Sequence, residues 1–402
     1  MGSAERKEHL HKENVPNLRF PEFSGEWGKT KFENIVSLQR GSSPRPIIEY
    51  ITKSEDGVNW VKIGDMPASG RIVTRTEEKI TREGAKKSRH VKIGDLILSN
   101  SMSFGQPYIM GIEGYIHDGW FVLRNYEKSL VRDYLCNLLI SPSIQQQYKR
   151  LAAGGVVQNI SSELVNSVIV SVPTKTEQKK IAEFISYIDD RIATQIKIIE
   201  KLESLIRGIS NNLLYSESGT PVRLGDILSE RSERTKVNNQ HEVLSSTVKG
   251  IFSQREYFSK DIASENNVGY KIIRLHDVVL SPQNLWMGNI NYNDKFDIGI
   301  VSPSYKIFSI ADSYDKRFVA AMLKTHRALY NYMLVSEQGA SVVRRNLNME
   351  AFEQLVFKMP PIDKQREIGN AISALQSRLE LAVRTKTAYE KQKQWLLTQM
   401  FI

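Results

Sequence analysis

The chain has 402 residues, of which 41% are hydrophobic and 25% are charged. This composition is typical of a globular protein with two or three domains, and it excludes a disordered acidic tail, a collagen and a small disulfide scaffold. Lysine and arginine (55) exceed aspartate and glutamate (45), so the net charge of +10 is compatible with a polyanionic partner but does not establish one.

The N-terminal residues and the single cysteine indicate a cytoplasmic protein. The opening stretch MGSAERKEHLHKE is charged and lacks the apolar segment of a signal peptide, and Arg6 stands where a myristoylation signal needs Ser or Thr. No run approaches the 18 or so apolar residues of a membrane span. Cys136 is the only cysteine, so we expect neither an internal disulfide nor a cysteine-rich zinc site, and its neighbours DYLCNLLI indicate a small core residue.

A first strand-rich module is predicted over residues 20–173, behind a polar extension of residues 1–19. Short apolar runs bounded by Gly, Pro, Asn and Ser predict its strands, at 59–66, 91–99, 107–112, 119–124 and 165–172. Helical patterns fit between them, as at 131–152. Two polar segments interrupt this pattern: the basic run at 86–89, and the loop SNSMSFGQ at 99–106 between two strand candidates.

A long helix is predicted over residues 176–214, within a segment assigned to 174–216. Thr176 can cap its first turn. Apolar residues then recur at alternating intervals of four and three, which is the pattern of a coiled-coil seam. The seam residues include Ile181, Ile185, Ile188, Ile192, Leu202 and Ile209.

The second half of the chain repeats this order. A module over 217–361 has strand candidates at 271–275, 277–281, 298–302, 305–310 and 355–359, and a helical pattern at 316–334. A final helix is predicted over 363–401, within a segment assigned to 362–402, with Asp363 as a possible cap. Lys386 and Lys393 interrupt its seam, which includes Ile368, Ile372, Leu375, Leu379 and Leu396.

An internal repeat underlies this order. The segment that begins at about residue 159 aligns without gaps with the segment 187 residues further along, which ends at the C-terminus. This alignment matches Gln178 with Gln365 and Ile185 with Ile372. Repeats of this kind decide the architecture. We predict an α+β fold, in which two strand-rich α/β modules are joined and separated by two long antiparallel coiled-coil helices around a pseudo-two-fold axis. The alternative is that each helix packs only on its own module.

No motif for catalysis or cofactor binding is present in the sequence. It lacks a GxxxxGK[ST] phosphate loop and an HExxH metal site. The tetrapeptide at 359–362 has two prolines but lacks the amide and the aromatic residue that would grip an adenine. The sequence therefore carries no enzyme signature and no recognisable site for a metal or a cofactor.

Together these features resemble the specificity subunit of type I restriction–modification enzymes. The resemblance covers nearly the whole chain, and its order of module, helix, module and helix is its most specific feature. KQREIG in the second helix departs from EQKKIA in the first, which affects details of helix packing. The residues that carry the resemblance are NLRFPEFSGEW (17–27), NWVKIGDM (59–66), GGVVQNISSELVNSVIVSVP (154–173), PTKTEQKKIAEFISYIDDRI (173–192) and GASVVRRNLNMEAFEQLVFKMPP (339–361).

The resemblance implies a non-catalytic chain that binds no cofactor itself. It also implies two target recognition domains that each read one half of a bipartite DNA sequence. The helices, roughly 50 Å long at 1.5 Å per residue, would fix the spacer between the halves. The implied partners are double-stranded DNA, two modification (methyltransferase) subunits and restriction (motor-nuclease) subunits. S-adenosylmethionine, ATP and magnesium would then reside on those subunits. Two other functions stay open: a repressor with two reading heads, and a coiled-coil scaffold that does not bind DNA.

Polar side chains in loops are the candidates for DNA contact. Side chains that can form two hydrogen bonds at once, such as Arg, Asn and Gln, recognise base edges, and small polar or basic side chains bind phosphates. The basic run could equally be a solvated face, the polar loops plain turns, and the tryptophan a core residue. The first-module candidates are Lys86, Lys87, Ser88, Arg89, Asn100, Ser101, Ser103, Phe104 and Gln106, and the second-module candidates are Lys249, Arg255, Gln283, Asn284, Trp286, Asn289, Arg344, Arg345 and Asn346.

Overall fold

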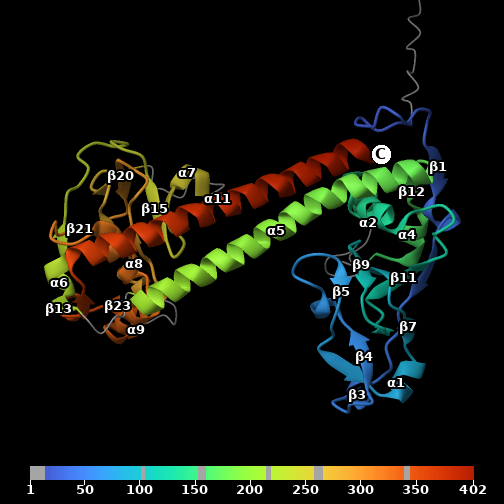
Figure 1. Ribbon diagram of the computed structural model, residues 1–402, viewed down its shortest axis with the longest axis horizontal. Helices are drawn as coiled ribbons and strands as arrows, with labels where there is room; N and C mark the ends of the chain where they lie inside the picture. The colour runs from blue at the N-terminus through green and yellow to red at the C-terminus, as the bar shows by residue number, and fades with distance from the viewer. Residues whose placement is uncertain (1–13, 101–104, 153–159, 214–218, 258–265, 339–344) are drawn as a thin grey trace, which may run out of the picture. The chain divides into compact units, whose positions relative to one another are not determined.

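The computed structural model describes residues 14–100, 105–152, 160–213, 219–257, 266–338 and 345–402, and it divides into two compact units (Figure 1). The first unit comprises Met1–Lys197 and Val383–Ile402, and the second comprises Ile198–Ala382. Each unit holds one strand-rich module and a part of each long helix. The boundary between the units therefore falls inside the helices.

Two five-stranded sheets form the first module, with strand orders β3-β6-β4-β10-β7 and β2-β11-β8-β9-β5. Strand β8 lies inside its sheet and is buried along its whole length, which explains its continuous apolar run LILS. The strands are β2 (Ser37–Arg40), β3 (Ile51–Thr52), β4 (Val58–Val61), β5 (Ile72–Val73), β6 (Glu78–Ile80), β7 (Arg89–Val91), β8 (Leu96–Ser99), β9 (Pro107–Met110), β10 (Gly114–Ile116) and β11 (Trp120–Arg124).

Helices cover the second of these sheets, and the structure differs from the sequence expectation at two places. The helical pattern at 131–152 forms two helices, α2 (Arg132–Ile140) and α3 (Pro142–Ala152), because Pro142 forces Ser141 into extended backbone. The strand expected at 165–172 is shorter, since Ser161 caps a helix, α4 (Ser162–Ser167), before β12 (Ile169–Val172) begins. Strand β12 pairs with β1 (Gly28–Lys31), and a short helix, α1 (Arg82–Lys86), precedes β7.

The segment 17–27 packs against the start of α5 (Lys175–Leu213) in the first unit. Glu177, in the first turn of α5, is only 1% exposed. Arg19 donates to both of its carboxylate oxygens at 2.8 and 2.9 Å, and Trp27 Nε1 donates to Oε1 at 3.2 Å. A buried carboxylate is tolerated only when it is paired in this way. The segment therefore covers and neutralises the beginning of the helix.

The second module has a four-stranded sheet, with order β14-β21-β18-β19, and several two-stranded pairs. Its helices are α6 (Leu224–Ile227), α7 (Gln254–Tyr257), α8 (Lys316–Leu323), α9 (His326–Leu334) and α10 (Met349–Glu353). The pattern at 316–334 is split between α8 and α9, because the Thr325 side chain accepts from Ala328 N and caps a new helix. The strands are β13 (Thr220–Arg223), β14 (Leu228–Arg231), β15 (Leu244–Thr247), β16 (Gly250–Ser253), β17 (Lys271–Arg274), β18 (Val278–Leu280), β19 (Ile290–Tyr292), β20 (Ile298–Val301), β21 (Lys306–Ile310), β22 (Ser336–Gln338), β23 (Arg345–Leu347) and β24 (Val356–Met359).

The internal repeat is visible in hydrogen bonds as well as in sequence. Gln178 donates to Pro173 O at 2.9 Å and accepts from Val131 N at 2.8 Å, just before α2. Gln365 donates to Pro360 O at 2.8 Å and accepts from Asp315 N at 3.0 Å, just before α8. Each glutamine thus ties the start of a long helix to the helix that follows the sheet of its own module.

The two long helices, α5 and α11 (Ile362–Met400), pack against each other within each unit. In the first unit Ile181, Ile185 and Ile188 share an apolar cluster with Leu396, and Ile192 is half-buried beside it. Asp189 pairs with Lys393, and Arg191 donates to Tyr389 Oη at 3.3 Å. Residue numbers rise along one helix as they fall along the other, so the predicted antiparallel pairing is confirmed.

In the second unit Ile368 and Ile372 are buried in the cluster on which Ile209 packs. The remaining predicted seam residues of this unit, Leu202, Leu375 and Leu379, are half-buried.

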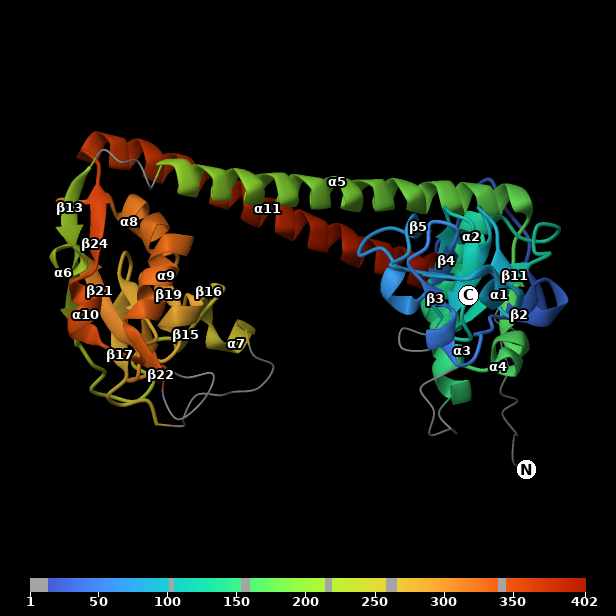
Figure 2. The ribbon, with the colours of Figure 1, turned by 90° about the horizontal axis from the view of Figure 1, so that it is seen from below.

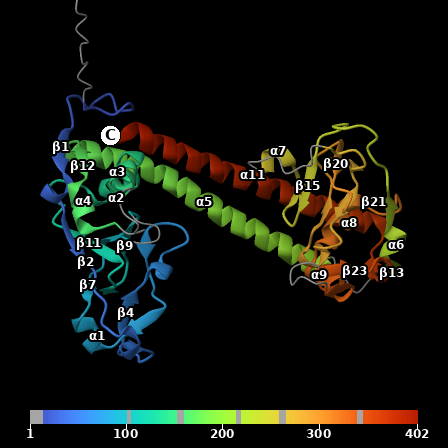
Figure 3. The same cartoon turned by 180° about the vertical axis from the view of Figure 1, so that it is seen from behind.

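The helix ends also pack on the modules. Figure 3 shows α2 beside the end of α11 in the first unit. There the Tyr134 ring of α2 stacks on the Phe401 ring, which follows α11, with 5.2 Å between the ring centroids. Figure 2 shows α8 beside the start of α11 in the second unit, where Phe318 is buried in the same cluster as Ile368. Packing on a module, the alternative considered above, therefore accompanies the pairing of the helices and does not replace it.

Candidate nucleic-acid interface

The two polar loops predicted to touch DNA occupy equivalent places in the two modules. The loop at 99–106 joins antiparallel strands β8 and β9, and the loop at 281–289 joins antiparallel strands β18 and β19. Ser99 N donates to Gln106 O at 3.0 Å, and Ser281 N donates to Asn289 O at 3.0 Å, so the same bond closes both loops. The side chain of Gln106 is half-buried. Ser101, Ser103 and Phe104 lie outside the described residues.

Asn100 supports the first loop and is not open to a ligand. Its side chain is 2% exposed and donates to Asp118 O at 2.8 Å. Its backbone N–H donates to Gly119 O at 3.0 Å, and its carbonyl accepts from Ile160 N at 2.9 Å. The predicted base contact by Asn100 is therefore corrected, since burial assigns the side chain to positioning the loop.

Asn289 has the same supporting role in the second loop. It is 5% exposed, accepts from Ser246 Oγ at 2.9 Å and donates to Ser246 O at 3.1 Å. This network joins the loop to the hairpin of β15 and β16. Lys324, which the sequence did not single out, adds a second link by donating to Gly288 O at 2.9 Å.

The second loop and the strand at 345–347 are in contact with each other. The Arg345 guanidinium lies 4.6 Å from the centroid of the Trp286 ring, and Arg345 N donates to Gln283 O at 3.2 Å. Among the described residues no carboxylate pairs with Arg345, so its donors are available to a ligand. Gln283 and Asn346 are exposed, Asn284 is half-buried, and Arg344 lies outside the described residues.

The remaining basic candidates are exposed. Lys249 lies in the turn between β15 and β16, and Arg255 lies in α7. In the basic run at 86–89, Lys86 is exposed at the end of α1, and Lys87 lies over the Tyr50 ring, 4.7 Å from its centroid. Ser88 stabilises the local turn, because its hydroxyl donates to Gly84 O at 3.1 Å.

The turn at 117–119 connects the basic run with the first loop. Arg89 Nε donates to Arg40 O at 3.2 Å, and Arg40 Nε in turn donates to Asp118 O at 3.2 Å. The same Asp118 carbonyl accepts from Asn100. Two segments predicted separately to contact DNA are thus joined through this turn in the first unit.

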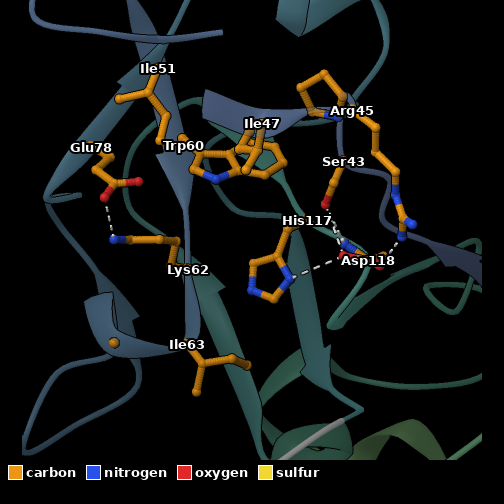
Figure 4. Close-up of a pocket in the computed structure, with 12 residues that line it drawn as sticks. Ser43, Arg45, Ile47, Ile51, Trp60, Lys62, Ile63, Glu78, His117 and Asp118 are labelled. Atoms are coloured by element: carbon orange, nitrogen blue, oxygen red, sulfur yellow. Dashed lines mark hydrogen bonds and ion pairs between the residues drawn. The ribbon is translucent and has the colours of Figure 1, made fainter. Parts of the chain in front are cut away.

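Sequence reasoning missed a pocket on this turn, which has a volume of about 600 Å³. It is lined by residues of four separate segments, from Ser43 to Asp118, so no local pattern marked it (Figure 4). The one sequence signal was Gly41 in the stretch QRGSSP. A Cβ at this position would stand 2.0 Å from His117 O, so only glycine lets the two segments approach this closely.

The described part of the chain has neither a membrane-spanning helix nor a metal-binding cluster. None of its helices is both long and apolar enough to cross a membrane. Its His, Cys, Asp and Glu side chains form no group of three or more that could hold a metal ion.

Comparison with known proteins gives a family match. Residues 25–204 match the model of the type I restriction modification DNA specificity domain. The MjaIX and MjaVIII specificity subunits of type I restriction enzymes from Methanocaldococcus jannaschii are 24% and 25% identical, over 46% and 48% of this chain. These alignments cover 43% and 46% of the two relatives, so the chain spans about half of their length. The putative MjaX specificity subunit of that organism is 21% identical over 96% of this chain and 95% of its own.

Solved structures share the fold. The S subunit of a type I restriction–modification system from M. genitalium has a TM-score of 0.60 at 15% identity, covering 96% of this chain and 99% of that one. A chain from a study of complex assembly in the type I system has a TM-score of 0.53 at 13% identity, covering 92% and 96%. The first half of the chain therefore matches a type I restriction modification DNA specificity domain, and the chain shares its fold with solved S subunits of type I restriction–modification systems.

Proposed function

We propose that this chain is the DNA sequence-specificity subunit of a type I restriction–modification complex, and that each unit reads one half of a bipartite target. The observation that carries the proposal is the duplication of one scaffold with a polar loop at the same place in both copies, each closed by the same backbone bond. Two copies of one reader within one chain suit a target with two separate halves.

The two halves of the target are expected to differ. The first loop reads SNSMSFGQ, and the second reads SPQNLWMGN with Arg345 stacked on its tryptophan. Direct readout depends on the identity and position of such side chains. Loops of different sequence on a common frame therefore favour an asymmetric target over a palindrome.

The helix pair is proposed to set the spacer between the two halves. Each long helix has 39 residues and contributes to both units. Because paired helices resist bending and keep a fixed rise per residue, their length can act as a ruler.

The chain is proposed to be non-catalytic and to work with partners. Two modification subunits carrying S-adenosylmethionine would methylate an adenine in each half, and restriction subunits using ATP and magnesium would cleave unmethylated DNA. Support comes from the family match and from the absence of phosphate-loop and metal-site motifs in the sequence.

The test is co-expression with a modification subunit of a type I system, followed by long-read methylation mapping. We expect a complex with two modification subunits per chain and methylation of one split, asymmetric sequence. Specific DNA binding by the chain alone, without any modification subunit, would instead support the two-headed repressor.

Salt dependence separates these readers from a scaffold. Binding through phosphate contacts weakens steeply as salt rises, because counterions are released on binding. A complex that binds no DNA at low or at high salt concentration would support the coiled-coil scaffold and contradict the proposal.

A further inference from the structure

The pocket of the first module is built by segments that lie far apart in sequence. Figure 4 shows the Lys62–Glu78 pair on one side and Ser43, Arg45 and Asp118 on the other, with His117 between them. Trp60, at the end of β4, forms an aromatic wall, and its ring centroid lies 6.1 Å from that of His117. The site therefore combines aromatic and aliphatic walls with converging polar groups, as ligand sites do.

The charges that line the pocket cancel. Lys62 Nζ lies 2.8 Å from Glu78 Oε1, and an Arg45 nitrogen lies 3.4 Å from Asp118 Oδ2. Asp118 also accepts from Ser43 Oγ at 2.8 Å. A bare phosphate would meet two carboxylates and no unpaired cation inside the pocket. The lining suits a neutral group that offers both donors and acceptors.

His117 contributes a neutral donor. Its Nδ1 accepts from Gly119 N at 2.8 Å, so the ring proton resides on Nε2. Burial lowers the pKa of His117 below its ordinary value, which keeps the ring uncharged at neutral pH. A neutral planar group with donors and acceptors on its edge and an apolar face is the description of a nucleobase.

The concave shape decides how a base could enter. The base edges of a duplex are recessed in its grooves and are read by side chains that protrude, so a pocket cannot receive them. A base that has left the stack does project from the helix, and proteins take such bases between apolar and aromatic side chains. Arg40 and Arg89, which are exposed and linked to this turn, are placed to hold the neighbouring phosphates.

We propose that this pocket holds one unpaired nucleobase of the half-site read by the first unit. The inference rests on the proposed function and adds to it a second mode of reading, in which the strand is opened at one position other than the methylated adenine. The Lys62–Glu78 pair and the His117 Nε2 proton read the edge of the base, and the Trp60 wall covers its face.

The experiment uses the complex of this chain with its modification subunits and the mapped target duplex. Each base pair of the first half-site, except the methylated one, is replaced in turn by a mismatch and by an abasic site on either strand. At one position we expect a mismatch to tighten binding by about tenfold, because the cost of opening the pair is removed. An abasic site on one strand at that position should weaken binding, and one on the other strand should not.

A swap of the pocket's ion pair links this position to the pocket. The double variant Lys62→Glu with Glu78→Lys retains a pair but exchanges donor and acceptor, so base preference should change at that one position. The control is Lys295→Glu with Glu380→Lys in the second unit, an exposed pair with the same 2.8 Å separation. This control should leave the first half-site unchanged.

Two results would overturn the inference. In the first, every mismatch in the first half-site weakens binding while methylation stays specific, so that the proposed function stands and the pocket holds no base. In the second, the swap weakens association with the modification subunits and leaves base preference unchanged, so that the pocket receives a protein side chain. Loss of all specific methylation in the unaltered complex would be a failure of the proposed function itself.

Discussion

At the scale of single residues, Gly41 shows how one backbone contact shapes the first unit. A side chain here would meet the His117 carbonyl 2.0 Å away, and that atom is backbone and cannot rotate aside. We expect Gly41→Ala to force strand β2 away from the turn and to lower the free energy of unfolding by about 1–3 kcal/mol. Denaturant unfolding of the complex measures this, with Gly64→Ala as the control, since no atom lies within 4 Å of a Cβ at Gly64. Equal stability of the two variants would contradict the reasoning.

Arg345 offers the sharpest residue-scale test of the second unit. Its guanidinium is stacked on Trp286 and has no acidic partner among the described residues. A bidentate arginine contact contributes about 1–3 kcal/mol of discrimination between bases, so Arg345→Ala should relax recognition in the second half-site only. Methylation mapping measures this, and Arg223→Ala, at an exposed arginine of the same unit, is the control. Relaxation of both half-sites would show that Arg345 is not a local reader.

Single residues are also where sequence reasoning was least informative. Asn100 and Asn289 are small polar residues in loops, which is what a base contact looks like in sequence, yet both are buried. Their burial depends on Asp118, in the turn at 117–119, and on Ser246, in β15, which are distant in sequence. The pocket lining is spread from Ser43 to Asp118, and no periodicity or motif connects such positions. Tertiary neighbours decide these roles, and one sequence does not reveal them.

At the scale of elements, the pairing of α5 with α11 depends on a polar contact inside an apolar seam. Lys393 interrupts the seam and is 15% exposed, and its ammonium is paired with Asp189. Asp189 also lies 3.8 Å from an Arg71 nitrogen, so Asp189→Asn leaves the Lys393 ammonium beside Arg71 without a carboxylate. We expect the free energy of unfolding to fall by about 1–3 kcal/mol. Thermal and denaturant unfolding of the complex measure the loss. The control is Glu390→Gln, which removes an exposed pair with Lys386 and should cost less than 1 kcal/mol or so.

The pH dependence of this loss follows from Lys393. Burial lowers the pKa of Lys393 below its ordinary value of 10.5, and removing Asp189 lowers that pKa further. The unfolded chain then binds a proton that the folded chain does not, so the stability of the variant rises as pH increases toward 10.5. The deficit of Asp189→Asn should therefore be largest near neutral pH and smaller near pH 10. A deficit that does not change with pH would exclude the unpaired ammonium as its cause.

Elements were the scale at which the sequence was most informative. The predicted helix at 176–214 corresponds to α5 at Lys175–Leu213, and the one at 363–401 corresponds to α11 at Ile362–Met400. Heptad spacing over ten positions is a strong signal, since it must be satisfied along the whole helix. The shorter helices were harder to predict from the sequence. Pro142 and Thr325 each divide one apolar pattern into two helices, and the pattern continues on both sides of the division.

At the scale of the whole molecule, the duplication predicts that the two halves of the target can be exchanged separately. The loop at 281–289 is held by contacts within the second unit, through Asn289 and Lys324. We expect replacement of exposed residues there, such as Gln283→Ala, to alter the second half-site and leave the first intact. Methylation mapping of this variant beside Gln106→Ala, in the first loop, measures the separation. A change in both halves from either variant would contradict independent reading by the two units.

The proposed ruler makes the last prediction at this scale. Seven residues inserted after residue 197 and seven after residue 382 keep the heptad register of both helices and lengthen each by about 10 Å. Because successive base pairs are about 3.4 Å apart, the spacer of the methylated target should lengthen by about three base pairs, with both half-sites unchanged. Matched insertions of four residues are the control, since they rotate the seam out of register and should reduce stability without giving a new spacer. Methylation mapping distinguishes these outcomes, and an unchanged spacer in a stable seven-residue variant would mean that the helices do not measure the DNA.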